Sequence, residues 1–167
     1  MRRHFLKDRE IKTLLEKTQP PIRDYLSERF LKDGRVERAE MARWMVYLFD
    51  GRSLLVEAEE GAVFPTLTSA EVLALLPKVV VDMGAVPSIC NGADLMAPGI
   101  VRVDGEFGKD SLITILDEKN RKPLAVGLSN YPSSDLAAAR QGKVAKNIHY
   151  VGDRLWRALL SAGFTRG

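Results

Sequence analysis

The segment CNGADLMAPG, residues 90–99, decides the fold of the second half of this chain. A short helix over residues 84–91 is predicted to end at Asn91-Gly92, and Pro98-Gly99 begins a strand. Glycine adopts backbone angles that are barred to other residues, and neither Gly92 nor Gly99 has a side chain to keep a partner away. The segment therefore predicts a tight apolar loop that presents main-chain donors to a bulky ligand.

The same segment has a second interpretation. A helix C-cap followed directly by the start of a strand would place Met96 in the core and leave no ligand site. Taken alone, the segment favours this second interpretation, and only the pattern of the remaining chain reverses the preference.

The composition is that of a globular protein with no metal or membrane chemistry. Of the 167 residues, 46% are hydrophobic and 28% are charged. The single cysteine excludes an internal disulfide and a thiolate zinc cage, and the only histidines, His4 and His149, lie far apart. The charged N-terminus lacks the apolar run of a signal peptide, and no stretch is long enough to span a membrane. We therefore expect a cytoplasmic protein without a cofactor.

The excess positive charge lies in the second half of the chain. Residues 1–77 contain 13 Lys and Arg against 13 Asp and Glu, whereas residues 78–167 contain 12 against 9. The net charge of +3 is too small to show nucleic-acid binding, but it points to the second half if a polyanion binds.

Leu76-Pro77 is the predicted domain boundary. Residues 1–77 combine two amphipathic helices, the first with Asp8 as its expected cap, and a hairpin in which Asp50-Gly51 joins two runs of strand formers. Thr68-Ser-Ala-Glu71 reads as a capping box for a helix that Pro77 ends. This half is therefore predicted to be a small α+β domain.

Residues 78–167 have a different pattern, dominated by short strands. Strands are expected at 79–81, 100–103, 112–116, 124–128 and 147–151, with a helix over 133–140 and a final helix capped by Asp153. This order predicts an α+β chain whose second domain is a pseudo-barrel of short, mostly antiparallel strands with two or three short helices.

Several motifs together resemble one known family. They are Phe64-Pro-Thr-Leu67, Val81-Asp-Met-Gly-Ala85, the loop Gly92–Gly99, Asn147-Ile-His-Tyr150, Asp153 and Leu155-Trp156. The pattern is similar to that of PUA-domain proteins of the malignant T-cell-amplified sequence and ligatin family, in particular its archaeal-type members. The resemblance implies an N-terminal domain at 1–77, a PUA domain with a C-terminal helix at 78–167, and RNA binding in translation.

The resemblance implies that the loop contacts RNA. Main-chain N–H groups around Gly92–Asp94 would hold phosphate or ribose oxygens, and Met96 would pack against a base or sugar. The loop residues predicted to bind RNA are Asn91, Gly92, Ala93, Asp94, Met96, Ala97, Pro98 and Gly99.

A basic run lies beside the last predicted strand and extends this candidate surface. Its predicted RNA-binding members are Arg140, Lys143, Lys146, Asn147 and His149, and Arg102 is a further candidate after the loop. The alternative is a solvated helix end, which explains Arg140 well and Lys146 poorly. His149 fits a structural hydrogen-bonding role better than that of a base, because no nucleophile is recognisable beside it.

These features predict a non-catalytic, translation-associated protein that binds structured RNA, either the acceptor end of tRNA or small-subunit rRNA. The small ribosomal subunit or a translation factor is an expected partner, and a membrane is not. Two alternatives remain open. One is an accessory subunit that delivers RNA to a modifying enzyme of the pseudouridine synthase or transglycosylase type. The other is a protein-interaction module.

Overall fold

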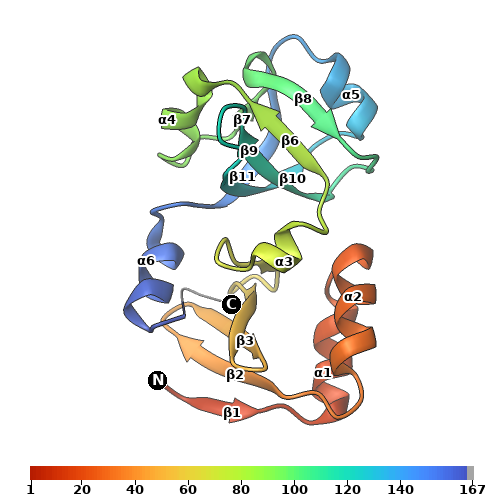
Figure 1. The fold of residues 1–167 in the computed structure, drawn as a ribbon, viewed down its shortest axis with the longest axis vertical. Helices are drawn as coiled ribbons and strands as arrows, with labels where there is room; N and C mark the ends of the chain where they lie inside the picture. Colours follow the sequence, from red (N-terminus) through yellow and green to blue (C-terminus); the bar gives the residue numbers. More distant parts are fainter. Residues whose placement is uncertain (165–167) are drawn as a thin grey trace. The chain divides into compact units, whose positions relative to one another are not determined.

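The computed structural model describes residues 1–164, and the chain divides into two compact units (Figure 1). The first unit comprises Met1–Leu75 together with the described residues from Ala158 onward, and the second comprises Leu76–Arg157. The division falls between Leu75 and Leu76, next to the Leu76-Pro77 pair.

The first unit is a five-stranded sheet with helices. Its sheet runs in the order β1-β2-β3-β4-β5, and all four pairings are antiparallel. Two helices that lie side by side, α1 and α2, come from the segment between β1 and β2 (Figure 1). In chain order the elements are β1 (Arg3–Phe5), α1 (Asp8–Glu16), α2 (Pro20–Phe30), β2 (Val36–Met41), β3 (Trp44–Phe49), β4 (Arg52–Glu57), β5 (Val63–Pro65) and α3 (Ala70–Leu73).

The predicted hairpin of the first unit is confirmed. Asp50 and Gly51 have φ values of 51° and 82°, the left-handed geometry that a tight turn between β3 and β4 requires. Strand β3 supplies Phe49, whose ring packs edge-on against Phe30 of α2 at 5.0 Å between centroids. This contact joins the sheet to a helix in the core of the unit.

Two helix starts differ from the predicted ones. Lys7, not Asp8, is the N-cap of α1, because Glu10 accepts a hydrogen bond from the Lys7 backbone N–H at 2.9 Å and closes a capping box one residue earlier. The helix expected to end at Pro77 is only the four-residue α3, and the side chain of its N-cap, Ser69, makes no capping bond. The segment that was predicted to form a longer helix therefore contains only about one helical turn.

The second unit is a curled six-stranded sheet in the order β7-β11-β10-β9-β6-β8. Its only parallel pairing in the described chain is β6 with β9, and the other four are antiparallel. The elements are β6 (Lys78–Val81), η1 (Met83–Ala85), α4 (Val86–Ile89), β7 (Leu95–Met96), η2 (Ala97–Gly99), β8 (Ile100–Asp104), β9 (Leu112–Asp117), β10 (Pro123–Ser129), α5 (Ser133–Ala138) and β11 (Lys143–Tyr150). The predicted α+β class with short strands and short helices is confirmed.

The final helix, α6 (Arg154–Ser161), begins where Asp153 accepts a hydrogen bond from the Trp156 N–H at 2.7 Å, as predicted. The residues after it differ from the prediction that 78–167 form one domain, because those from Ala158 onward belong to the first unit. Ser53 donates a hydrogen bond to the Phe164 carbonyl at 2.8 Å, and the Arg3 guanidinium lies over the Phe164 ring. These contacts hold the end of the described chain in the first unit.

Candidate functional site

A groove of about 380 Å³ lies along the 90–99 segment in the second unit. Its walls come from the residues between β6 and β8, where η1, α4, β7 and η2 follow one another (Figure 1). Five of the predicted RNA-binding residues line it, namely Ala93, Asp94, Met96, Pro98 and Gly99. The structure thus brings more than half of the predicted loop to one concave surface.

The two glycines of the segment are required for different reasons. Gly92 has φ +93°, and a Cβ there would stand 3.1 Å from the Tyr150 ring. Gly99 does not have a positive φ, but a Cβ there would stand 3.0 Å from the Ala85 Cβ. Gly92 therefore permits the turn, whereas Gly99 permits the close approach of η2 to η1.

The main-chain donors of Gly92 and Ala93, which were predicted to hold RNA oxygens, are already bonded within the protein. The N–H of Gly92 donates to Ile89 at 3.0 Å and that of Ala93 to Ser88 at 3.0 Å, the two bonds of a Schellman helix ending. The Asn91 N–H also donates to Ser88. The helix-cap interpretation is therefore right for the backbone, while its placement of Met96 in the core is wrong, since Met96 is 49% exposed.

Asn147 holds the loop against the last strand of the sheet. Its backbone N–H donates to Asp94 Oδ1 at 2.8 Å, and its Nδ2 donates to the carbonyls of Ile89 and Ala93, each at 3.0 Å. All three hydrogen bonds are made within the protein. Asn147 therefore positions the loop, and its side-chain N–H donors are not available to a ligand.

Two lysines lie beside the groove because β7 pairs with β11. Lys143 is opposite Met96 in that ladder, and its Nζ lies 3.1 Å from Asp94 Oδ2. The hydrogen bond from the Asn147 N–H, and then the positive charges of Lys143 and Lys146, lower the pKa of Asp94 below its usual range. Lys146 is exposed. The groove therefore has a charged margin with two cations and one carboxylate.

Four other predicted residues are placed less favourably. Arg102 pairs with Asp104 at 2.8 Å on β8 and does not line the groove. Arg140 is exposed in the loop after α5, which ends at Ala138. Ala97 and His149 are buried, at 4% and 0% exposure, so neither reaches a ligand.

The burial of His149 has a local cause in the sheet. A β-bulge between Val126 and Gly127 inserts Ile148 between the paired positions His149 and Asn147. His149 instead meets Asp153, with 2.8 Å between Nδ1 and Oδ2. Simple alternation would put Asn147 and His149 on one face, and the bulge between them breaks that alternation.

Sequence reasoning missed part of the groove. Asp82, Gly84, Ala85 and Ser88 line it opposite the loop. Asp82 is fixed by accepting a hydrogen bond from the Ala85 N–H at 2.9 Å. The Val81-Asp-Met-Gly-Ala85 motif contains three of these residues, so it could have indicated that this segment belongs to the site.

The described residues carry no metal-binding group of three or more His, Cys, Asp or Glu. Within the same part of the chain, no helix has the length and apolarity needed to cross a membrane. Burial raises the pKa of the Cys90 thiol, which disfavours the reactive thiolate.

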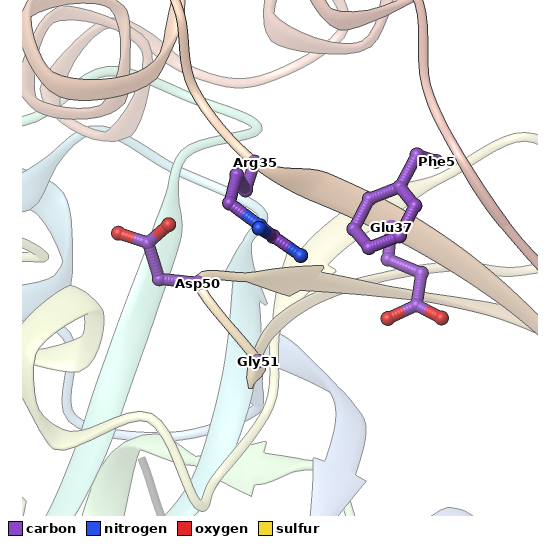
Figure 2. A pocket seen from close by; sticks show the side chains of 5 residues that line it. All are labelled: Phe5, Arg35, Glu37, Asp50 and Gly51. Atoms are coloured by element: carbon purple, nitrogen blue, oxygen red, sulfur yellow. The ribbon is translucent and has the colours of Figure 1, made fainter.

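A second hollow, of about 370 Å³, lies in the first unit. Figure 2 shows its side chains, with Arg35 between Asp50 and Phe5. The Arg35 guanidinium lies 5.0 Å from the centre of the Phe5 ring, and Arg3 holds Glu37 by hydrogen bonds of 2.8 and 2.9 Å. These groups already satisfy one another, so this hollow is best explained as surface packing.

Asn147→Ala tests the role of Asn147 in holding the loop. We expect the free energy of unfolding to fall by about 2 kcal/mol, because two hydrogen bonds worth about 1 kcal/mol each are lost. Amide hydrogen exchange should accelerate around residues 91–96, and chemical denaturation gives the stability. Asn120→Ala, at the exposed β9–β10 turn, is the matched control. Unchanged exchange in the loop would mean that the β7–β11 ladder alone holds it.

Known proteins match both the second unit and the whole chain. The family model described as the PUA domain matches residues 77–151. An uncharacterised protein of Methanocaldococcus jannaschii is 34% identical over 158 residues, which cover 93% of this chain and 95% of that protein. Translation machinery-associated protein 20 of Schizosaccharomyces pombe is 27% identical, with 91% of this chain and 87% of that protein covered.

A solved structure agrees with this relationship. A PUA-domain protein from Aeropyrum pernix K1 superposes with a TM-score of 0.78 at 28% identity, covering 96% of this chain and 91% of that one. Malignant T-cell-amplified sequence proteins are also among the relatives, at 27% identity for the mouse protein 2. The chain belongs to the family of PUA-domain proteins that includes the malignant T-cell-amplified sequence proteins and translation machinery-associated protein 20.

Proposed function

We propose that this protein is a non-catalytic, cytoplasmic RNA-binding factor of the translation apparatus that holds an unpaired RNA end in the groove beside residues 90–99. The observation that carries the proposal is the placement of Lys143 and Lys146 on the strand next to a groove with an exposed Met96. The groove accepts a nucleoside, and the lysines pair with the phosphates that flank it.

The lining of the groove favours sugar and base over phosphate. Asp82 and Asp94 present carboxylates, which repel phosphate and accept hydrogen bonds from ribose hydroxyls or exocyclic amino groups. Gly84 and Ala85 present little side-chain bulk to the groove, and Met96 offers an apolar surface to a base. An unpaired nucleotide fits these features better than a duplex does.

The acceptor end of tRNA is the RNA that best meets these requirements, because it ends in unpaired nucleotides beside a duplex. An exposed single-stranded segment of small-subunit rRNA is the second candidate. The name of the relative translation machinery-associated protein 20 supports a role in translation, and the small ribosomal subunit is the partner we expect.

The site geometry supports binding rather than catalysis. Cys90 has a raised thiol pKa, and His149 is fully buried against Asp153, so neither is arranged as a nucleophile or an accessible base. Delivery of RNA to a separate modifying enzyme remains compatible with the same groove, and co-purification with such an enzyme would assign that role.

The test compares a tRNA with the same tRNA trimmed of its unpaired 3′ nucleotides. Affinity is measured by fluorescence anisotropy over a range of salt concentrations. We expect the intact tRNA to bind at least tenfold more tightly and its affinity to fall steeply with salt, because neutralised phosphates release counterions. Equal binding of the two RNAs would contradict an end-binding groove, and a flat salt response would contradict RNA binding through the lysines.

A further inference from the structure

We propose that the first unit carries a phosphate-binding site in the hollow between α1 and the sheet strands β2, β3 and β4. The hollow measures about 300 Å³ and is separate from the groove of the second unit. The polar side chains that carry the proposal are Arg9 and Thr13 of α1, Lys17 at its C-cap, Arg38 of β2, Tyr47 of β3 and Glu57 of β4.

Regular secondary structure brings these side chains together. Arg9, Thr13 and Lys17 are spaced four residues apart and so share one face of α1. Arg38 and Tyr47 are directly opposite each other in the β2–β3 ladder, which places their side chains on one face of the sheet. The elements thus gather the cationic side chains at one hollow, and the Thr13 hydroxyl is held there by its bond to the Arg9 carbonyl at 2.9 Å.

The carboxylates of the hollow are occupied by protein partners. Glu57 accepts a hydrogen bond from the Tyr47 hydroxyl at 3.1 Å on Oε1, and Lys17 Nζ lies 2.8 Å from Oε2. Glu10 is held by the Lys7 backbone N–H in the capping box. Both carboxylates that line the hollow are thus engaged.

The cations of the hollow are not fully matched. Arg9, Lys17 and Arg38 give three positive charges against the two of Glu10 and Glu57. Among residues 1–164, Arg38 Nε is buried and has no hydrogen-bond partner. The ion pair of Arg38 with Glu40 is long, at 4.0 Å, and the guanidinium also interacts with Tyr47 and Glu10. A buried donor without an acceptor is costly, and an anion in the hollow would remove that cost.

The Tyr47 hydroxyl stays protonated throughout the physiological pH range, and it donates that proton to Glu57. Burial, and then the neighbouring Glu57 carboxylate, raises the pKa of Tyr47 to about 12. The hydroxyl therefore does not add a negative charge that would repel an anion.

The donor chemistry points to a phosphate group. Arginine offers a planar fork of N–H donors and lysine a compact charge, the combination used to bind phosphate oxygens. Leu6 and Leu14 add an apolar wall on which the organic part of a phosphate ester can rest. The hollow at Phe5 lacks this arrangement, since its Arg35 is stacked on the ring and its Glu37 is held by Arg3.

The test titrates the full-length protein with inorganic phosphate at constant ionic strength, followed by amide chemical shifts. We expect saturable shifts at residues 9–17, 38 and 47, and at least tenfold weaker phosphate binding in Arg38→Gln. Arg43→Gln, an exposed site in the turn between β2 and β3, makes the same charge change outside the hollow and should bind normally. No saturable shift in the wild type, or an equal loss in both variants, would overturn the proposal.

Two further measurements cover a failure of Arg38→Gln to fold and identify the source of the phosphate. If Arg38→Gln fails to fold, Arg9→Gln on the exposed surface of α1 replaces it and should weaken phosphate binding severalfold. Measuring the RNA affinity of the wild type and of the variant then distinguishes between two sources of the phosphate. Weaker RNA affinity in the variant with a shallower salt slope identifies an RNA backbone phosphate, whereas unchanged RNA affinity identifies a free phosphate or small phosphate ester.

Discussion

Replacing both Lys143 and Lys146 by glutamate is expected to weaken RNA binding by about a hundredfold near physiological salt, because two phosphate contacts are lost and two repulsive charges are added. Both side chains are exposed beside the groove, and Lys143 is already close to Asp94. The slope of log affinity against log salt should become shallower by about two, one for each lost lysine contact. Anisotropy titrations over a salt series measure both quantities.

The matched control for this double variant is Lys109→Glu with Lys119→Glu. These lysines are exposed in the same unit but do not line the groove, and their replacement makes the same change in net charge. We expect a loss of only a few fold. If the two double variants lose equal affinity, the net charge of the protein, and not the groove, accounts for RNA binding. Intact RNA binding with loss of a protein partner would favour the interaction-module alternative.

The elements that follow local rules could be predicted from the sequence. Asp50-Gly51 specifies a left-handed turn between two runs of strand formers, and Asp153 has an N–H donor within reach at Trp156. Such features depend on a few neighbouring residues, so no knowledge of the remaining fold is needed. Five of the six strands of the second unit were predicted from their runs of strand formers, and the two-residue β7 was missed.

The features that depend on distant pairings could not be predicted. Strand β1 has only three residues and is defined by its ladder with β2, more than thirty positions away in the chain. The bulge that separates Asn147 from His149 leaves no mark in composition or periodicity. Strict alternation would place the buried His149 on the same face as Asn147.

Residues 90–99 form both a helix C-cap and part of a groove, so each of the two interpretations of this segment is partly right. The backbone of residues 91–93 completes a helix cap, while the side chains of Asp94, Met96 and Pro98 line the groove. This cap uses the N–H groups of Gly92 and Ala93, so recognition must come largely from the side chains that line the groove. This is the physical reason to expect a nucleoside rather than a phosphate inside the groove.

Asp153→Asn is expected to lower the free energy of unfolding by about 3 kcal/mol at neutral pH, because hydrogen bonds to a charged acceptor are worth roughly 1.5–3 kcal/mol each. Asp153 accepts from His149, from the Tyr150 N–H at 3.0 Å and from the Trp156 N–H. Burial acts to raise the pKa of Asp153, but the hydrogen bonds from His149 and the backbone outweigh it, and the pKa is lowered.

The pH dependence of this loss follows from the lowered pKa of Asp153. The stabilisation is fully present above the carboxyl pKa of the unfolded chain, about 3.9, and is lost as pH falls through the lower pKa of the folded state. The gap between wild type and Asp153→Asn in denaturant unfolding should therefore be constant from pH 7 to 5 and close below about pH 4. Asp135→Asn, an exposed change on α5, should stay within about 0.5 kcal/mol of the wild type. A gap that persists undiminished into acid would mean that the asparagine disturbs packing, and that the charge of Asp153 does not hold the end of β11 to the start of α6.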